Sequence, residues 1–248
     1  MPSNVDTAVA ALLDVRKGKP RLSVDFCRAH PLTFAESLQV QEKVTAALGT
    51  VGGWKVAPGS TKENPSFAPV LAKDVLGATE SFAKGRFQVI GVECEIAFRM
   101  GKDLGGGSYT REQVADAIEA LVPLIEICET RLADAKAGPP EWRMADSISQ
   151  GAIMIGKPIT DWRSVNVTDQ PLTLTFNGEK VADVPGSKQA DLVAVVTLLA
   201  NQIGKHCGGI KKGQIVTTGS MSGNIPAKPG TEAVATYKNL GVLKAKFA

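Results

Sequence analysis

The chain has 248 residues, 44% hydrophobic and 21% charged, which suffices for one large domain or two small ones around a substantial core. The formal net charge of +3 is spread along the chain without a basic block, so we expect neither a nucleic acid nor a membrane surface as partner. No segment is apolar enough to cross a bilayer, and no secretory signal pattern opens the chain, which predicts a cytoplasmic protein. The four cysteines form no Cys-x-x-Cys pair, which is typical of reduced thiols.

The beginning of the chain favours helices. Apolar residues recur at helical spacing over Val5–Arg16. Thr33 is the predicted N-cap of a second helix that runs to Leu48, and Glu36 completes a capping box three residues later.

Strand patterns dominate after Val51. We therefore predict an α+β fold, with a small helical N-terminal portion over residues 1–50 and a β-rich catalytic domain over residues 51–248. Within the second part, Asn177-Gly178 predicts a hairpin turn. Thr110 and Gln113 form a second capping-box pattern, which predicts a helix over Glu112–Leu121.

Two carboxylates lie two residues apart in the strand-like run VECEIAFRM, Val92–Met100. Residues i and i+2 of a strand share a face, so Glu93 and Glu95 would project side by side and repel each other unless a cation lies between them. The alternative is that both are solvated residues on the polar face of an amphipathic strand.

A second acidic run, LVPLIEICETR over Leu121–Arg131, contains Glu126. Together with Glu93 and Glu95, it would complete an all-oxygen site suited to Mg²⁺ or Mn²⁺. The polar loop over Leu132–Trp142 is a reasonable lid for such a site.

Several motifs in a fixed order resemble the fumarylacetoacetate hydrolase superfamily, and within it the 2-keto-4-pentenoate hydratase and 4-oxalocrotonate decarboxylase branch. They are VGGWKVAPGS, VECEIAFRMGKDL, EICETR, ADSISQGAIMIG and IVTTGSMSGNIPAKPGTEAVATYKNLGVLKAKF. The resemblance runs from about Leu12 to the C-terminus. It implies the β-rich mixed-sheet roll of that superfamily and a homo-oligomer.

The resemblance also implies site residues. Lys55 and Ser149 would be catalytic, Ser220 and Asp146 would contact substrate, and the three glutamates would bind the metal. From the residues alone other readings stay open, because Lys55 could be a surface lysine and the segments around Asp146 and Ser220 ordinary turns.

One short segment departs from the resemblance, at Ser66 and Ala68. Many hydratases of the branch read Pro-Asp-Phe-Gly where this chain has Pro65-Ser66-Phe67-Ala68. A serine cannot serve as a carboxylate base at neutral pH, so the substrate or the activity could differ.

A three-carboxylate metal site leaves positions for a chelating 2-oxo or 2-enol carboxylate. We therefore predict a hydratase that adds water to a 2-hydroxy-2,4-dienoate in the catabolism of aromatic compounds. The alternatives are decarboxylation of a 4-oxalocrotonate-type acid, or a non-catalytic subunit that binds a 2-oxo acid or a partner of the same fold. Hydrolysis is disfavoured, because the resemblance implies a histidine-centred base for that reaction. The two histidines, His30 and His206, lie outside the matching motifs, and we expect each to be a surface or helix-end residue.

Overall fold

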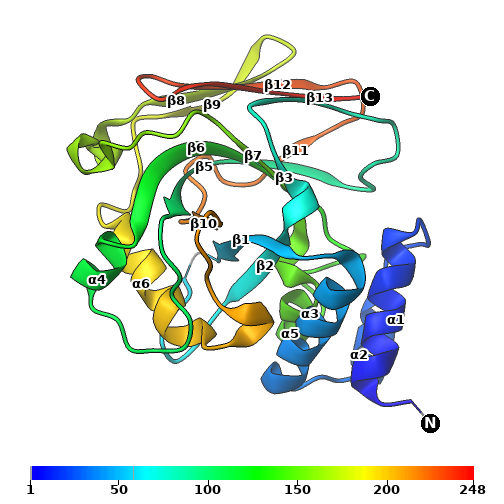
Figure 1. The fold of residues 1–248 in the computed structure, drawn as a ribbon. Helices are drawn as coiled ribbons and strands as arrows, with labels where there is room; N and C mark the ends of the chain where they lie inside the picture. The colour runs from blue at the N-terminus through cyan, green and yellow to red at the C-terminus, as the bar shows by residue number, and fades with distance from the viewer. Residues whose placement is uncertain (1, 58) are drawn as a thin grey trace.

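Two β-sheets form the body of the molecule, and most helices lie on the side of the larger sheet away from the smaller one (Figure 1). This computed structural model describes residues 2–57 and 59–248. Within them the larger sheet has eight strands in the order β2-β1-β10-β5-β6-β7-β3, with β11 paired to β5. Its strands are β1 (Val51–Val56), β2 (Phe67–Leu71), β3 (Val75–Leu76), β5 (Ile90–Met100), β6 (Ile118–Cys128), β7 (Gln150–Ile155), β10 (Ile215–Thr217) and β11 (Ile225–Ala227).

The smaller sheet has five strands, in the order β4-β13-β12-β8-β9. They are β4 (Thr79–Phe82), β8 (Leu172–Phe176), β9 (Glu179–Val184), β12 (Glu232–Tyr237) and β13 (Gly241–Phe247). Asn177 and Gly178 join β8 to β9 with φ values of 50° and 86°, as the hairpin prediction requires. Two sheets with helices concentrated toward the N-terminus confirm the predicted α+β fold class.

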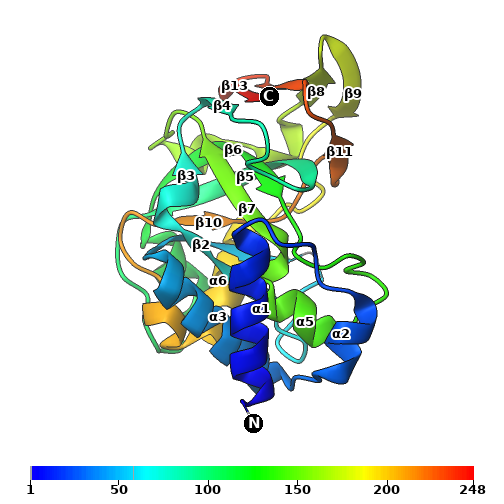
Figure 2. The same ribbon diagram turned by 90° about the vertical axis from the view of Figure 1, so that its right-hand side faces the viewer.

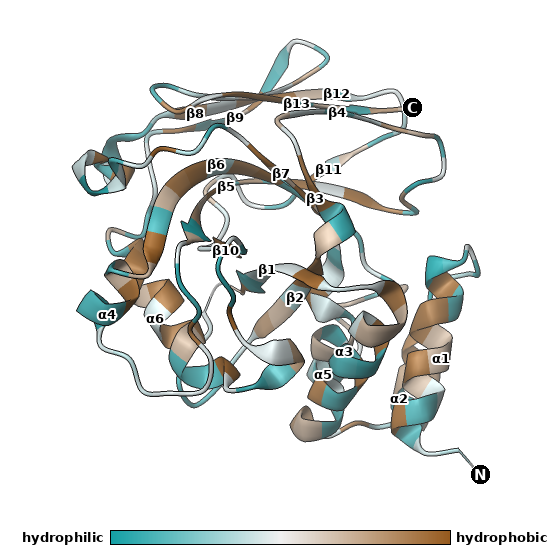
Figure 3. Ribbon diagram, in the orientation of Figure 1, coloured by the Kyte–Doolittle hydropathy of each residue, from teal (hydrophilic) through white to brown (hydrophobic). Residues whose placement is uncertain are grey.

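The two long strands β5 and β6 run through the centre of the larger sheet. Nearly every residue of both is buried, which agrees with their largely apolar sequences (Figure 3). The hydroxyl oxygen of Tyr237 in the smaller sheet lies 2.9 Å from the carbonyl oxygen of Glu95 and 2.6 Å from that of Leu124. This contact links the smaller sheet to the segment of β5 and β6 that carries the acidic residues.

Three helices precede β1; the two at Val5–Arg16 and Thr33–Leu48 were predicted, and the short one between them was not. They are α1 (Asn4–Arg16), α2 (Val24–Ala29) and α3 (Phe34–Leu48), and α5 (Pro140–Ala145) packs against α3 beside them (Figure 2). Their shared core contains Leu12, Val44 and Trp142. The capping box of Thr33 and Glu36 is present at the start of α3.

Replacing Thr33 by alanine is expected to lower the free energy of unfolding by about 1 kcal/mol, because the amide of Glu36 loses its capping oxygen. Urea denaturation measures this change. Thr33→Ser keeps the hydroxyl and should remain near the wild type, whereas equal losses in both variants would contradict a capping effect.

The predicted helix over Glu112–Leu121 is wrong in extent. The capping box of Thr110 and Gln113 forms, but helix α4 covers only Arg111–Ala115 and β6 begins at Ile118. Leu121 pairs with Phe98 of β5 in a fully buried position, and Pro123 would obstruct a continuing helix. Burial between two neighbouring strands therefore outweighs the local helical pattern.

The remaining long helix is α6 (Leu192–Ile203), capped by Asp191. Across the described residues, no helix combines the length and apolar character that a membrane crossing needs.

Candidate active site

The predicted carboxylates lie together on the two central strands. Glu93 and Glu95 share a face of β5, and Glu126 of β6 is the direct cross-strand partner of Glu93. One ligand atom from each of Glu93, Glu126 and Cys128 lies within 4.8 Å of the others. The sheet register therefore brings the two acidic runs to one place.

A cavity of about 620 Å³ opens over this face of the sheet. Glu93, Glu95 and Glu126 line it, together with Lys55 from β1 and Ser149. The loop after β6 also contributes, through residues 133–136. The predicted lid segment thus borders the cavity that holds the carboxylates.

Backbone and side-chain donors orient the carboxylates. Asn224 Nδ2 donates to Glu93 Oε1 at 2.8 Å, and the amide of Gly219 donates to Glu95 Oε2 at 3.0 Å. Gly219 has a φ of 106°, a conformation that favours glycine. This turn lets the backbone reach Glu95.

Lys55 is buried at the base of the cavity. Its Nζ donates to Glu126 Oε1 and, at 2.9 Å, to the carbonyl oxygen of Ile148. Ile148 has a φ of 48°, and its neighbours Ser147 and Ser149 are also left-handed, at 49° and 61°. Three consecutive non-glycine residues in the left-handed region make this backbone segment strained. The hydrogen bond from Lys55 to Ile148 helps to maintain its conformation.

The acidic cluster carries excess negative charge. Burial, Glu126 and Glu93 raise the pKa of Glu95 to about 8. Burial also raises the pKa of Glu126 above its usual value, although Lys55 opposes this. For Lys55, burial lowers the pKa, but Glu126 and its other acidic neighbours outweigh burial and keep the ammonium charged.

Without metal, protein stability is expected to fall as pH rises from about 4.5 to about 8. The pKa of folded Glu95, about 8, lies above its ordinary value of 4.5. In this window the folded state holds a proton that the unfolded state has released, so higher pH favours unfolding. Thermal unfolding in EDTA across this range measures the slope. Saturating Mg²⁺ should flatten the slope because the cation replaces the proton, and an unchanged slope in Glu95→Gln would contradict this origin.

The donor set fits a hard divalent cation. Glu93, Glu95 and Glu126 provide carboxylate oxygens, the ligands that Mg²⁺ and Mn²⁺ prefer. Cys128 lies close to Glu93 and Glu126, but burial and Glu126 raise the pKa of its thiol well above the usual value. A protonated thiol is a poor ligand, so the carboxylates are the suitable donors.

Two predicted substrate contacts lie apart from this cavity. Asp146 is 2% exposed, and its carboxylate pairs with Arg131 and accepts from the amide of Arg131 at 2.9 Å. Its position indicates a structural ion pair that anchors the residues after β6. Ser220 lines a neighbouring cavity of about 550 Å³, which shares Val56 and Ala57 with the first.

Sequence reasoning did not single out several cavity residues. Asn224 follows β10, whereas Lys136 lies in the loop after β6 and Arg143 in the nearby helix α5, and all three line the cavity. A single polar residue gives no signal of this kind on its own, because only the folded sheet shows which segments meet. Ser66, which stands where many hydratases of the family have an acidic residue, places its hydroxyl 3.6 Å from the sulfur of Met144.

These features define a cavity over a mixed sheet, with three carboxylates and a buried lysine at its base. Over residues 56–248 the chain matches the fumarylacetoacetate (FAA) hydrolase C-terminal family. The protein belongs to this family, which confirms the resemblance found in its motifs.

Sequence comparison with two relatives agrees with this family membership. The chain is 32% identical over 156 residues to 2-hydroxyhexa-2,4-dienoate hydratase of Comamonas testosteroni, covering 62% of this chain and 59% of that enzyme. It is 31% identical over 160 residues to 4-oxalocrotonate decarboxylase of a Pseudomonas species, covering 61% and 58%. The matched segment thus spans less than two thirds of the length of each of these relatives.

The fold also matches a solved structure, that of 4-oxalocrotonate decarboxylase from Pseudomonas putida G7 complexed with magnesium and adipate. The TM-score is 0.86 with 98% of this chain and 97% of that chain covered, at 20% identity. At this identity the similarity establishes the fold.

Proposed function

We propose that the protein is a metal-dependent hydratase that adds water to a 2-hydroxy-2,4-dienoate, giving a 4-hydroxy-2-oxo acid in the breakdown of aromatic compounds. The observation that carries this proposal is the placement of Glu93, Glu95 and Glu126 in one cavity above Lys55. Mg²⁺ or Mn²⁺ would be held by the three carboxylates. The similarity to a dienoate hydratase supports this choice of reaction.

The charges around the cavity suit an anionic substrate once a cation is bound. Three basic side chains, Lys55, Lys136 and Arg143, face four acidic ones, which are the three glutamates and Asp134. A divalent cation would turn this small negative excess into a positive one. A substrate carboxylate would then be attracted into the cavity.

The cation would supply Lewis acidity, stabilising negative charge that develops on the 2-oxygen of the substrate. In the overall reaction, the dienol loses its hydroxyl proton and gains a proton at C5, and water then adds OH to C4 and a proton to C3. Lys55 stays protonated beside Glu126, so its Nζ can hold the substrate carboxylate or move a proton. Ser149 would orient substrate or water from the rim.

A second candidate is decarboxylation of a 4-oxalocrotonate-type acid. It needs the same electron sink at the 2-oxo group, and it is supported by the 31% identity to a 4-oxalocrotonate decarboxylase. The two reactions differ in their products, because only decarboxylation releases CO₂.

The test is to follow the loss of dienol absorbance when the protein meets 2-hydroxypenta-2,4-dienoate with Mg²⁺ or Mn²⁺, with the products identified. We expect metal-dependent formation of the 4-hydroxy-2-oxo acid, abolished by EDTA. CO₂ release from 4-oxalocrotonate without hydration of the dienoate would instead establish the decarboxylase. Inactivity toward both compounds would reject both reactions.

A non-catalytic role stays as a further alternative, prompted by Ser66 in place of the acidic residue of many hydratases. If the missing carboxylate limits turnover, Ser66→Asp should raise activity with the dienoate. No gain would weaken that alternative. We also expect a homo-oligomer, as the family resemblance implies, and light scattering after size-exclusion chromatography tests the assembly.

A further inference from the structure

A strained turn between α5 and β7 borders the acidic cavity, the one that holds the three glutamates. Its residues Ser147, Ile148 and Ser149 all have left-handed backbone conformations, which non-glycine residues rarely adopt. The turn supplies two groups to the cavity. The carbonyl oxygen of Ile148 accepts from Lys55 Nζ at 2.9 Å, and Ser149 lines the cavity. Such a conformation persists only where the surrounding structure holds it.

The residues on either side of the turn bind to one side chain, the guanidinium of Arg131. Its Nη2 donates to the carbonyl oxygen of Asp146 at 2.7 Å, and its Nη1 donates to that of Gln150, also at 2.7 Å. Its Nε donates to the carboxylate of Asp146. Asp146 directly precedes the turn and Gln150 directly follows it, so one planar group fixes both ends of the turn.

Arg131 is itself firmly placed. Its side chain is 1% exposed, and its backbone amide donates to Asp146 Oδ2 at 2.9 Å. It follows closely after β6, the strand that carries Glu126. The same segment also bonds to the turn directly, because the amide of Glu129 donates to the carbonyl oxygen of Ser149 at 2.8 Å. The central sheet therefore sets the position of the turn.

This set of contacts is specific to an arginine. The guanidinium has three nitrogens in one plane, and each of them has an acceptor here. A lysine would keep the positive charge opposite the Asp146 carboxylate, but its single nitrogen cannot replace all three bonds. Arg131 and Asp146 thus form more than a pair of opposite charges.

We propose that Arg131 is a positioning residue, which holds the turn over Ser147–Ser149 so that Ile148 orients Lys55 and Ser149 faces the acidic cavity. Arg131 is not among the described residues that line this cavity, so it acts through the turn. The effect of Arg131 on turnover rests on the proposed function, whereas its effect on the turn does not.

Amide hydrogen exchange tests the effect on the turn without any substrate. The amide of Glu129 reports on the turn directly, because its acceptor is the carbonyl oxygen of Ser149. We expect this amide to exchange at least about tenfold faster in Arg131→Lys than in the wild type, while the amides of β5 keep their protection. Equal rates at Glu129 in both proteins would overturn the proposal. A parallel rise in β5 would also overturn it, because that result shows a general loss of stability.

Steady-state kinetics tests the effect on turnover. Arg131→Lys should lower kcat for the dienoate at least about tenfold, because Lys55 and Ser149 lose their alignment. The Mg²⁺ concentration that gives half-maximal activity should stay within about twofold of the wild type, since Asn224 and Gly219 orient carboxylates independently of the turn. Circular dichroism at the assay temperature confirms that the variant is folded.

The two measurements separate this proposal from the proposed function. A wild-type kcat in Arg131→Lys would overturn the role of Arg131 in turnover. Inactivity of the wild type toward the dienoate would reject the proposed function, and the exchange rate at Glu129 would still decide whether Arg131 holds the turn.

Arg163→Lys is the matched control. Arg163 also bonds both a carboxylate and a backbone carbonyl, those of Asp116 at 3.1 Å and Ala115 at 3.0 Å, but its side chain is exposed to solvent. This variant should keep the wild-type exchange rate at Glu129 and the wild-type kcat. Equal changes in Arg163→Lys and Arg131→Lys would overturn a specific role for Arg131.

Discussion

Replacing Glu93 and Glu95 together by glutamine is expected to lower kcat/KM for the dienoate by about 10³-fold, an effect of the size seen when preorganised electrostatic stabilisation is removed. Both carboxylates point into the cavity and are positioned by Asn224 and Gly219. Glutamine keeps the shape but removes the negative charges that would hold a divalent cation. Activity measured across Mg²⁺ concentrations separates weakened metal binding from lost turnover.

Glu119→Gln is the matched control. Glu119 lies on the same β6 strand as Glu126 but is exposed to solvent. This variant should retain wild-type activity and Mg²⁺ dependence. Full activity of the double variant in EDTA would contradict a metal role for the two carboxylates.

Replacing Lys55 by methionine is expected to lower the free energy of unfolding by about 3–5 kcal/mol in the absence of metal. Lys55 and Glu126 are both nearly fully buried, so removing the ammonium leaves the Glu126 carboxylate without its cation. The carbonyl of Ile148 also loses a donor. Activity should fall as well, because Lys55 is the only buried lysine among the described residues that line the cavity.

Urea denaturation with EDTA, and again with saturating Mg²⁺, measures the effect. The metal should restore part of the lost stability in Lys55→Met, because it supplies positive charge to the same carboxylates. Lys157→Met, at an exposed position, is the control and should remain near the wild type. A loss in Lys55→Met that Mg²⁺ does not reduce would contradict a shared electrostatic role.

Local sequence rules predicted much of the fold. The capping boxes at Thr33 and Thr110 form as expected, and the turn at Asn177-Gly178 joins two strands. These features depend on residues within a few positions of each other. The prediction of a helix over Glu112–Leu121 was wrong in its second half. That half forms a strand because it pairs with β5, a contact that local sequence rules do not include.

In the candidate site, too, local patterns were predicted correctly, whereas contacts between distant segments were not. Strand alternation indicated that Glu93 and Glu95 share a face, but only the register of β5 and β6 shows that Glu126 lies opposite Glu93. The family resemblance indicated Lys55 and Ser149, which both line the cavity. It also indicated Asp146, whose buried pairing with Arg131 could not be read from the motif.

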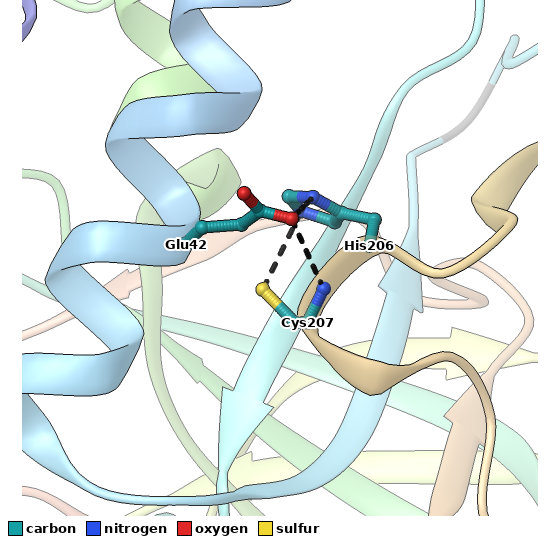
Figure 4. A group of neighbouring side chains, drawn as sticks. All are labelled: Glu42, His206 and Cys207. Atoms are coloured by element: carbon teal, nitrogen blue, oxygen red, sulfur yellow. Dashed lines mark hydrogen bonds and ion pairs between the residues drawn. The ribbon is translucent and has the colours of Figure 1, made fainter.

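The residue His206 illustrates the limit of sequence reasoning most clearly. Its place after α6 agrees with a helix-end residue, yet the ring is buried against Gln41 and Glu42. Its two partners lie more than a hundred and sixty positions earlier in the chain. No local pattern connects such residues, and the packing of α3 against the short turn η5 (His206–Gly208) brings Glu42 beside His206 (Figure 4).

Calorimetric titration with oxalate, a chelating analogue of a 2-oxo acid, tests the central claim most directly. We predict that oxalate binds the wild type with Mg²⁺ and not with EDTA, and that Glu93→Gln/Glu95→Gln does not bind it under either condition. Equal oxalate binding with and without metal, or unchanged binding in the folded double variant, would contradict a metal site built from these carboxylates.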